Sequence, residues 1–580
     1  MDERTRRADE IRARRSEVEN HLIDEYKNGK ISRKELVRRG TVVGMSIPLL
    51  GFLAAACGGD DEEAAAPAPP ADTGGAAAPP APAPEPAPPP APAGGGKIRT
   101  AVIAPAGSLD PIKVADEGGL AGLAQSGEYL TWSDSQLQLQ PRLAESWAPN
   151  SDGSVWTFQV RQGVTFHDGT PLTAEDVAAT LNLHADPDNG SNALSVFTGV
   201  LSPGGAKAVD DATVEVTLDA PNGNFPYLVS SDNYNLIILP ASYAGDWEKT
   251  FLGTGPWILE SYTPQQGITY AKNPNYWDPS RQPKPDVSEL KFYPEEQARV
   301  LALQGGEVDV LSNFSVSGGK ALLTDSNIAV IEIRASQHRQ IHMRTDKEPF
   351  TDKRVRQAMA LLLDRQAIVD GLFEGKADLG NDSPFAPAFP STDASVAQRA
   401  KDIEAAKQLL ADAGKSDGFE VQLDTWDGFE IPDLAVLLQS AAKEAGITIK
   451  LNVTDPGTYY GDAVFGKSPW LDSVLGITDY GHRGVPNVLL TAPLTSEGPW
   501  NSSHFKNPAY DKLVADYVAA FDLETQRAVA KQIQELLLDE TPLIIPYFYF
   551  HLAATRAGIS GVEPTGMGHI DVSQALGLSA

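Results

Sequence analysis

Few side chains in this 580-residue sequence have the types and spacing that catalysis or metal binding needs. It contains no G-x-S-x-G, no Walker phosphate loop, no H-E-x-x-H and no G-x-G-x-x-G after a predicted strand. His338 and His342 are four residues apart, a spacing that on a helix could supply two metal ligands. However, the surrounding IRASQHRQIHMRT alternates as a strand does, and no acidic or cysteine partner is adjacent. The pattern favours structural histidines and predicts neither a metal site nor catalytic residues.

Cys57 is the only cysteine, so the sequence allows no internal disulfide and no cysteine metal cluster. It follows an uncharged stretch, residues 40–56, which basic residues precede and which contains Pro48. This stretch is short for a membrane span and predicts the apolar part of a secretory signal. The alanines before Cys57 resemble a bacterial lipobox, although Leu53 stands one position further from the cysteine than that motif prefers. The resemblance implies that acylated Cys57 anchors the protein to a membrane; the alternative is an incidental cysteine.

The segment after Cys57, residues 58–96, consists mostly of Ala, Pro and Gly and has almost nothing to bury. Proline favours an extended backbone, so this segment predicts a disordered tether. Upstream, SRKELV resembles a twin-arginine export motif with Lys34 in place of the second arginine, which leaves twin-arginine and general secretory export both open. We therefore expect residues 1–57 to form an amino-terminal extension with export signal and lipobox, and the protein to be lipid-anchored on the outer face of the cytoplasmic membrane.

The remaining residues, 97–580, alternate between strand and helix patterns. VWTFQV at 155–160 has the period of a half-buried strand, and Thr173 with Asp176 has the spacing of a helix-capping box. Residues 419–426, 431–446 and 447–453 predict a strand, a helix and a strand, and hence a βα crossover in an α/β fold. One long helix is expected at about 508–539. The net charge of −30 argues against nucleic acid or an anionic membrane surface as a partner of this body.

Several motifs in this body occur in the order found in the extracellular solute-binding proteins of ABC importers, family 5, the peptide/nickel family. The family's segments G-T-G-P…N-P-x-Y-W, A-L-x-x-G-E-x-D and P-F-x-D-x-R-V-R-Q-A are all matched. The resembling stretches are residues 141–177, 253–279, 302–311 and 349–377.

The resemblance implies a two-lobed α/β fold like that of the type II periplasmic binding proteins, in the large variety with three subdomains. A hinge would join the lobes, and a cleft between them would hold the ligand. By similarity, lobe I would comprise about 97–342 and 546–580, including a subdomain at 141–239. Lobe II would comprise about 343–545.

The resemblance also implies ligand-binding residues. Peptide-binding members hold the ligand's ammonium group with an aspartate in a W-x-x-D-Y motif, which matches Asp479 and Tyr480 in GITDYGH, although Gly476 replaces the tryptophan. A turn-capping role is the alternative for Asp479. The other expected site residues, each of which could instead serve packing alone, are Glu128, Asn313, Trp426, Tyr459 and Tyr547.

The expected function is capture of oligopeptides by a monomeric lipoprotein, which delivers them to ABC permease subunits in the membrane without catalysis or cofactor. Within the same class, the solute could instead be a nickel chelate, an oligosaccharide or an opine. A surface-anchored hydrolase and a sensor or adhesin are the alternatives from other classes.

Overall fold

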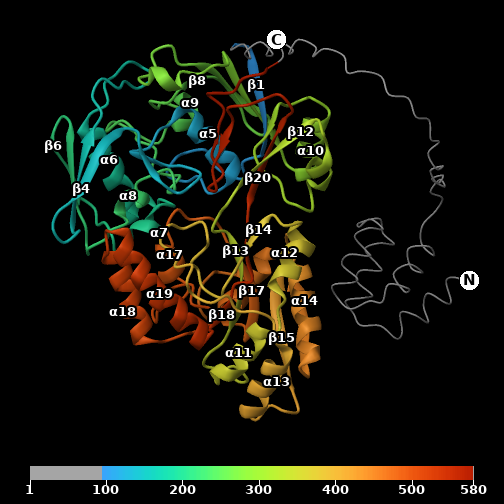
Figure 1. Cartoon of the computed structure of the whole chain (residues 1–580). Coiled ribbons are helices and arrows are strands. Elements are labelled where there is room, and N and C mark those ends of the chain that lie inside the picture. The colour runs from blue at the N-terminus through green and yellow to red at the C-terminus, as the bar shows by residue number, and fades with distance from the viewer. Residues whose placement is uncertain (1–94, 579–580) are drawn as a thin grey trace, which may run out of the picture. The chain divides into compact units, whose positions relative to one another are not determined.

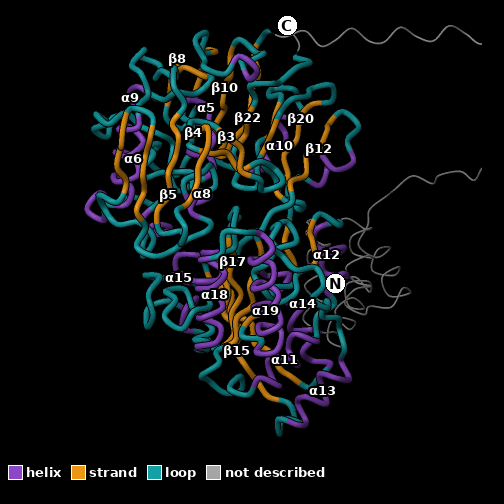
Figure 2. The backbone as a smooth tube through the Cα atoms, turned by 60° about the vertical axis from the view of Figure 1, so that its left-hand side comes forward, coloured by secondary structure: helices purple, strands orange, loops and turns teal. Residues whose placement is uncertain are grey.

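The computed structural model describes residues 95–578 (Figure 1). The predictions for residues 1–57, including Cys57, and for nearly all of the tether concern residues outside the described range. The body has two lobes, each built around a seven-stranded sheet, as the strands in Figure 2 show. We call them the first and second lobe according to these sheets.

The first lobe contains a sheet in the strand order β12-β20-β11-β1-β10-β9-β8. Its central strand β1 pairs in parallel with β10 and β11, while the outer pairs are antiparallel. The helices α5 (Glu117–Ser126) and α10 (Glu296–Gln304) pack against β1. The strands are β1 (Lys97–Ile103), β8 (Trp257–Thr263), β9 (Gly267–Lys272), β10 (Val287–Tyr293), β11 (Val310–Leu311), β12 (Ile328–Ile333) and β20 (His551–Arg556).

A small subdomain extends the first lobe with a four-stranded antiparallel sheet in the order β4-β5-β7-β6. The predicted strand 155–160 is confirmed as β5, with Trp156, Phe158 and Val160 in the core. The predicted capping box is also confirmed, because the Thr173 backbone N–H donates to the Asp176 carboxylate at 2.8 Å. Its elements are β4 (Ala144–Pro149), β5 (Val155–Val160), α6 (Ala174–Ala185), η1 (Pro187–Asn189), α7 (Leu194–Phe197), β6 (Ala206–Asp210), β7 (Thr213–Thr217) and α8 (Phe225–Leu228).

The hairpin β2 (Thr131–Ser133) and β3 (Leu139–Pro141) leads into this subdomain. Its turn places Leu137 in a hydrophobic cluster that otherwise belongs to the second lobe. The remaining short elements of the first lobe are α9 (Trp247–Thr250), η2 (Pro279–Arg281), η3 (Lys320–Thr324), β21 (Glu563–Pro564) and β22 (Ile570–Asp571).

The second lobe is a three-layer structure in which helices cover both faces of its sheet. The path is β14-β19-β13-β17-β15-β16, and β18 pairs with β13. The predicted crossover is confirmed, because β15 and β16 pair in parallel and α14 lies between them in the chain. The strands are β13 (His338–Met343), β14 (Ala377–Leu379), β15 (Phe419–Trp426), β16 (Ile447–Thr454), β17 (Leu475–Tyr480), β18 (Leu543–Ile544) and β19 (Tyr547–Tyr549).

One face of this sheet forms a core with α11–α14, and the other forms a core with α17–α19. The helices are α11 (Lys353–Leu361), α12 (Arg365–Phe373), α13 (Ile403–Asp412), α14 (Ile431–Glu444), α15 (Pro456–Tyr460), α16 (Pro469–Asp472), α17 (Asn487–Thr491), α18 (Pro508–Ala519) and α19 (Leu523–Glu540). The prediction of a single helix at about 508–539 was wrong. This segment forms two helices, because Asp522 caps the start of α19 by accepting a hydrogen bond from the Thr525 N–H.

The chain passes between the two large sheets twice, after Ile333 at the end of β12 and again between Tyr549 and His551. The lobe boundaries expected after residue 342 and before residue 546 therefore fall within the second sheet. The reason is that β13 pairs with β17, and β19 pairs with β14, inside the second lobe.

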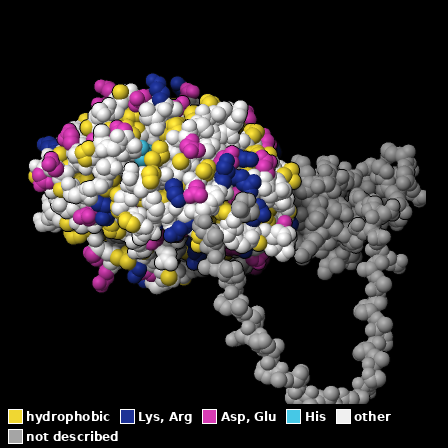
Figure 3. Space-filling model, turned by 90° about the horizontal axis from the view of Figure 1, so that it is seen from above, with side chains coloured by type: hydrophobic (Ala, Val, Ile, Leu, Met, Phe, Trp, Pro, Cys, Tyr) yellow, Lys and Arg dark blue, Asp and Glu magenta, His cyan; other side chains and the backbone are white. Residues whose placement is uncertain are grey.

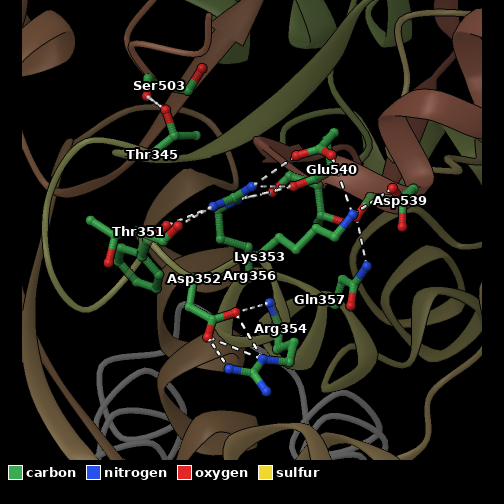
Figure 4. A network of polar contacts seen from close by, with 12 residues as sticks. Thr345, Thr351, Asp352, Lys353, Arg354, Arg356, Gln357, Ser503, Asp539 and Glu540 are labelled. Carbon is green, nitrogen blue, oxygen red and sulfur yellow. Dashed lines mark hydrogen bonds and ion pairs between the residues drawn. The ribbon is translucent and has the colours of Figure 1, made fainter. Parts of the chain in front are cut away.

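A buried arginine joins the first helix of the second lobe to its last (Figure 4). Arg356 in α11 donates to the carbonyl oxygens of Glu540 at 2.6 Å and Thr541 at 3.2 Å, at the carboxyl end of α19. It also donates to the carbonyl of Phe350 at 2.7 Å. The guanidinium thus satisfies carbonyls that the end of a helix leaves without partners.

Acidic and basic side chains are interspersed over the face shown in Figure 3. Among the described helices, none has both the length and the apolar character needed to cross a membrane.

Candidate functional site

In both lobes, the carboxyl ends of parallel strands lie next to the segments that connect the two lobes. In the second lobe, β15 and β17 end at Trp426 and Tyr480, and the antiparallel strand β13 begins at this same end with His338. In the first lobe, β11 ends beside the start of β20 at His551. Loops at the carboxyl ends of parallel strands form the usual ligand crevice of α/β sheets, so the region between these ends is the candidate site.

Asp479 lies at this end of β17, directly opposite Arg339 of β13. The Tyr460 hydroxyl, at the end of α15, donates a hydrogen bond to Oδ1 of Asp479 and lies 3.1 Å from the Thr478 hydroxyl. Within the described part of the chain, the second carboxylate oxygen, Oδ2, accepts no hydrogen bond, and the side chain is half-buried. The carboxylate is therefore held in place with one oxygen free to accept a bond from a ligand.

A neutralised ion pair lies beside Asp479. Arg339 is 1% exposed, and its Nε lies 2.9 Å from Oε1 of Glu430, which precedes α14. Tyr547 donates to the same Glu430 oxygen at 2.9 Å, and Arg339 donates to the Tyr549 hydroxyl at 2.7 Å. Because Arg339 and Glu430 offset each other, Asp479 is the member of this group whose charge no ion pair balances.

Aromatic rings cluster around Tyr460, which contacts the carboxylate of Asp479. Trp426 contacts Tyr460 and Phe429, with ring centroids 6.0 and 5.5 Å apart. Tyr460 also contacts Trp470, whose centroid is 5.4 Å away. Phe429 is 68% exposed, so this aromatic surface is open to contact. Aromatic walls provide contact area that tolerates varied ligands, while a few polar groups fix their orientation.

The facing end of the first lobe carries a second group of polar side chains. Asn313, two residues after β11, accepts a hydrogen bond from Arg299 through Oδ1 and donates one from Nδ2 to Glu117. His551 lies beside it, with Nε2 3.2 Å from the Ser312 carbonyl. Glu117 is exposed at the start of α5 and adds negative charge on this side.

The model of bacterial extracellular solute-binding proteins, family 5 (middle region), matches residues 138–475. The chain belongs to this family. Family 5 proteins bind solutes for ABC importers and are not enzymes, so the hydrolase alternative is set aside.

Curated relatives of this family 5 protein cover most of its length. It is 28% identical over 439 residues to heme-binding protein A of Haemophilus influenzae, covering 70% of this chain and 78% of the relative. It is 28% identical over 506 residues to the periplasmic oligopeptide-binding protein OppA of Salmonella typhimurium, covering 76% and 85%.

Solved structures share the fold. HbpA2 from Haemophilus parasuis aligns with a TM-score of 0.73 at 23% identity, covering 83% of this chain and 100% of that one. The periplasmic binding protein DppA from Helicobacter pylori, in complex with the peptide STSA, aligns with a TM-score of 0.67 at 22% identity, covering 83% and 98%. The predicted type II α/β fold is thereby confirmed.

The structure brings some of the family 5 site residues expected from sequence to the strand ends and places others in cores. Asp479, Tyr480 and Trp426 lie at the carboxyl ends of β17 and β15. Tyr547 is fully buried and reaches the site only through Glu430. Tyr459 is also fully buried, in the same core as Tyr480.

Glu128 is buried within the first lobe. Its carboxylate accepts hydrogen bonds from the Thr254 hydroxyl at 2.9 Å, the Tyr276 hydroxyl at 2.7 Å and Trp277 Nε1 at 2.7 Å. Burial raises the pKa of Glu128, and these three donors oppose the shift. Both oxygens are used by the lobe's own side chains, so the structure does not bring Glu128 to Asp479.

The residues that sequence reasoning missed are Arg339, Glu430, Phe429 and Tyr460. No local pattern marks them, because Arg339 and Glu430 are 91 positions apart and meet only when β13 packs beside the start of α14. Gly476, which replaces the motif's tryptophan, has a tertiary reason. A Cβ there would lie 2.4 Å from Cε1 of His342.

The histidines of β13 are buried within the second lobe, and the strand predicted around them is confirmed. His338 lies with Nδ1 2.8 Å from the Ser336 carbonyl, and His342 lies 3.3 Å from that of Ser473. Burial lowers their pKa values to about 4 and about 3. Over residues 95–578, no group of three or more His, Cys, Asp or Glu side chains is arranged to hold a metal ion.

Proposed function

We propose that this protein is a lipid-anchored peptide-binding component of an ABC importer, which captures peptides between its lobes and delivers them to membrane permease subunits. The observation that carries the proposal is Asp479, a carboxylate positioned by Tyr460 with one oxygen free, at the strand ends that face the first lobe. A peptide's ammonium group needs such a charged partner when it leaves water.

The charge and the walls of the site support the same ligand class. Asp479 and the exposed Glu117 give it negative character, while Trp426 and Phe429 offer surface to side chains of varied shape. Relatives with peptide-binding names add to this support, among them the dipeptide-binding protein DppE of Bacillus subtilis, 25% identical over 485 residues. Closure of the lobes around the solute would stabilise the state that the permease recognises.

The test is to identify the solute that the protein carries. Protein purified without denaturation would be subjected to mass spectrometry of the released ligand, and a panel of two- to eight-residue peptides would be screened for a rise in Tm. We expect a subset of peptides to raise Tm, and we expect the N-acetylated forms of the same peptides to leave Tm unchanged. Recovery of a nickel chelate, heme, a sugar or an opine, with no peptide raising Tm, would replace the peptide assignment.

Acylation of Cys57 can be tested on cells. The Cys57→Ser variant is expected to appear in the soluble extracytoplasmic fraction instead of the membrane fraction, because serine cannot form the thioether that carries the lipid. Two or more acyl chains are needed for stable anchoring, so the shift should be nearly complete. Fractionation with immunoblotting measures it, and substitution of Ser46 in the preceding apolar stretch by alanine is the control. A variant that stays with the membrane would contradict the anchor.

A further inference from the structure

A cavity lies between the small subdomain and the second lobe. Its volume is about 70 Å³, enough for a carboxylate group of a solute. Tyr227, Asp232 and Tyr234 line it from the first lobe, and Arg483 and Val488 line it from the second. Any solute group in this cavity therefore touches both lobes at once, and such a contact favours the closed arrangement.

Direct contacts also join the lobes, one of them through Asn487, the chain neighbour of Val488 in the cavity wall. Asn224 donates from Nδ2 to Oδ1 of Asn487 at 2.8 Å, across 263 positions of sequence. The Gly223 N–H donates to the carbonyl of Val518 at 2.8 Å. The cavity is thus part of the interlobe boundary and is distinct from the cores of the lobes.

Arg483 contributes a positive charge that no carboxylate pairs with directly. Its Nη1 donates to the carbonyl of its own neighbour, His482, at 2.7 Å, and no ion pair joins it to any described residue. Burial lowers its pKa, an effect that Tyr234 and Asp232 partly oppose. Its backbone is held to the connecting segment, because its N–H donates to the Ser336 hydroxyl at 2.9 Å and its carbonyl accepts from that hydroxyl at 2.9 Å.

Asp232 contributes a carboxyl group with an unused oxygen. Its Oδ2 is buried without a hydrogen-bond partner and rests against Gly484, where a Cβ would lie only 1.6 Å away. Burial raises the pKa of Asp232 to about 7, Arg483 opposes the shift, and Asp134 from the β2–β3 turn adds to it. The phenols of Tyr227 and Tyr234 are the other titratable groups that line the cavity.

We propose that Arg483 is a second contact point for the solute, which binds the solute's carboxylate in this interlobe cavity, and that Asp232 sets the charge of the cavity. The inference rests on the proposed function and refines it to peptides with a free carboxyl terminus. A guanidinium suits a carboxylate because it can donate two parallel charge-assisted hydrogen bonds.

The spacing of the two contact points limits the solute's length. Asp479 and Arg483 are four positions apart, and an extended chain spans at most about 3.3–3.6 Å per residue, so their Cα atoms are at most ~14 Å apart. A peptide whose ammonium contacts Asp479 and whose carboxylate contacts Arg483 is therefore short. We expect short peptides such as trialanine to bind more tightly than peptides of eight residues.

Asp232 makes this contact pH-dependent. Above pH 7 its carboxylate offsets the charge of Arg483, and below pH 7 its protonated form leaves that charge uncompensated. The affinity for a free-acid peptide is therefore expected to rise as the pH falls from 8 to 6. Calorimetry with trialanine and trialanine amide at both pH values measures this effect.

The variants separate the two roles. Arg483→Gln is expected to lower the affinity for trialanine at least tenfold and to leave the affinity for trialanine amide nearly unchanged. Arg483→Lys should have an intermediate affinity for trialanine. Asp232→Asn should bind trialanine at pH 8 as tightly as the wild type does at pH 6, without pH dependence. Unchanged circular dichroism spectra would establish that each variant is folded.

Arg483→Gln could lower the affinities for trialanine and for trialanine amide equally, and this result would overturn the inference. An unaltered pH dependence of trialanine binding in Asp232→Asn would also overturn it. Failure of the proposed function has a different signature, because wild-type protein would then bind neither trialanine nor its amide. A wild type that binds acid and amide equally, but rejects N-acetyl trialanine, would overturn the role of Arg483 alone.

Discussion

Replacing Asp479 with alanine is expected to weaken peptide binding by about 2–5 kcal/mol, or roughly 30-fold to several thousandfold. The physical reason is that the peptide's ammonium would leave water without a charged partner, in a site where the Arg339–Glu430 pair is already neutral. Isothermal titration calorimetry with a peptide that raises the wild-type Tm measures the loss. The unliganded variant should keep its Tm, because Asp479 is only half-buried.

Matched variants assign this loss to charge. Asp479→Asn preserves an acceptor for the Tyr460 hydroxyl and removes the charge, so it should lose nearly as much affinity as alanine. Tyr460→Phe removes only the group that positions the carboxylate, and a loss of about tenfold is expected. N-acetylation of the peptide should cost the wild type much affinity and the Asp479→Ala variant little. Equal effects of acetylation on both proteins would rule out an ammonium contact at Asp479.

Replacing Asp382 with asparagine is expected to destabilise the second lobe by about 3–5 kcal/mol. Asp382 is fully buried and accepts two hydrogen bonds from Arg365 Nη2, at 2.7 and 2.8 Å, and one from Arg399 at 2.6 Å. It also accepts from the Ile545 N–H at 3.2 Å. Removal of this charge leaves two guanidinium groups without a counter-charge. Asparagine avoids a backbone penalty because it tolerates the left-handed conformation of this residue, φ +52°.

Urea unfolding, followed by tryptophan fluorescence, measures this destabilisation. The control is Glu420→Ala, which breaks an exposed pair with Lys450 whose side chains are 56% and 63% accessible. That variant should change stability by less than about 1 kcal/mol, because water screens the pair. Similar losses in both variants would mean that the Asp382 cluster contributes no more than a surface ion pair.

The parts of the fold that the sequence predicted well are those in which neighbours in the chain are neighbours in space. The alternation of Trp156, Phe158 and Val160 predicted β5, because a half-buried strand turns every second side chain toward the core. The helix predicted at 431–446 is α14, and Gly446, with φ +80°, follows its end. The helix expected at 508–539 failed because helical periodicity continues across the short break that Asp522 caps.

The candidate site was less predictable, since its members come from distant segments. Resemblance to family motifs directed attention to Asp479, but no local pattern marked Arg339, Glu430 or Tyr460. Glu128 shows the opposite case. Its sequence position suggested a ligand contact. In the structure, however, its buried carboxylate accepts hydrogen bonds from Tyr276 and Trp277 of the same lobe.

The sequence by itself therefore determined the family, the α/β class and the local elements, because motif order and hydrophobic period are properties of contiguous residues. Only the tertiary structure decided which charges meet. Asp232 and Arg483 share a cavity although strands of both sheets lie between them in the chain, and Asp479 meets Tyr460 and Arg339 at the strand ends of one sheet. The physical reason is that the surroundings of a charge, and so its pKa and its availability to a ligand, depend on what long-range packing places beside it.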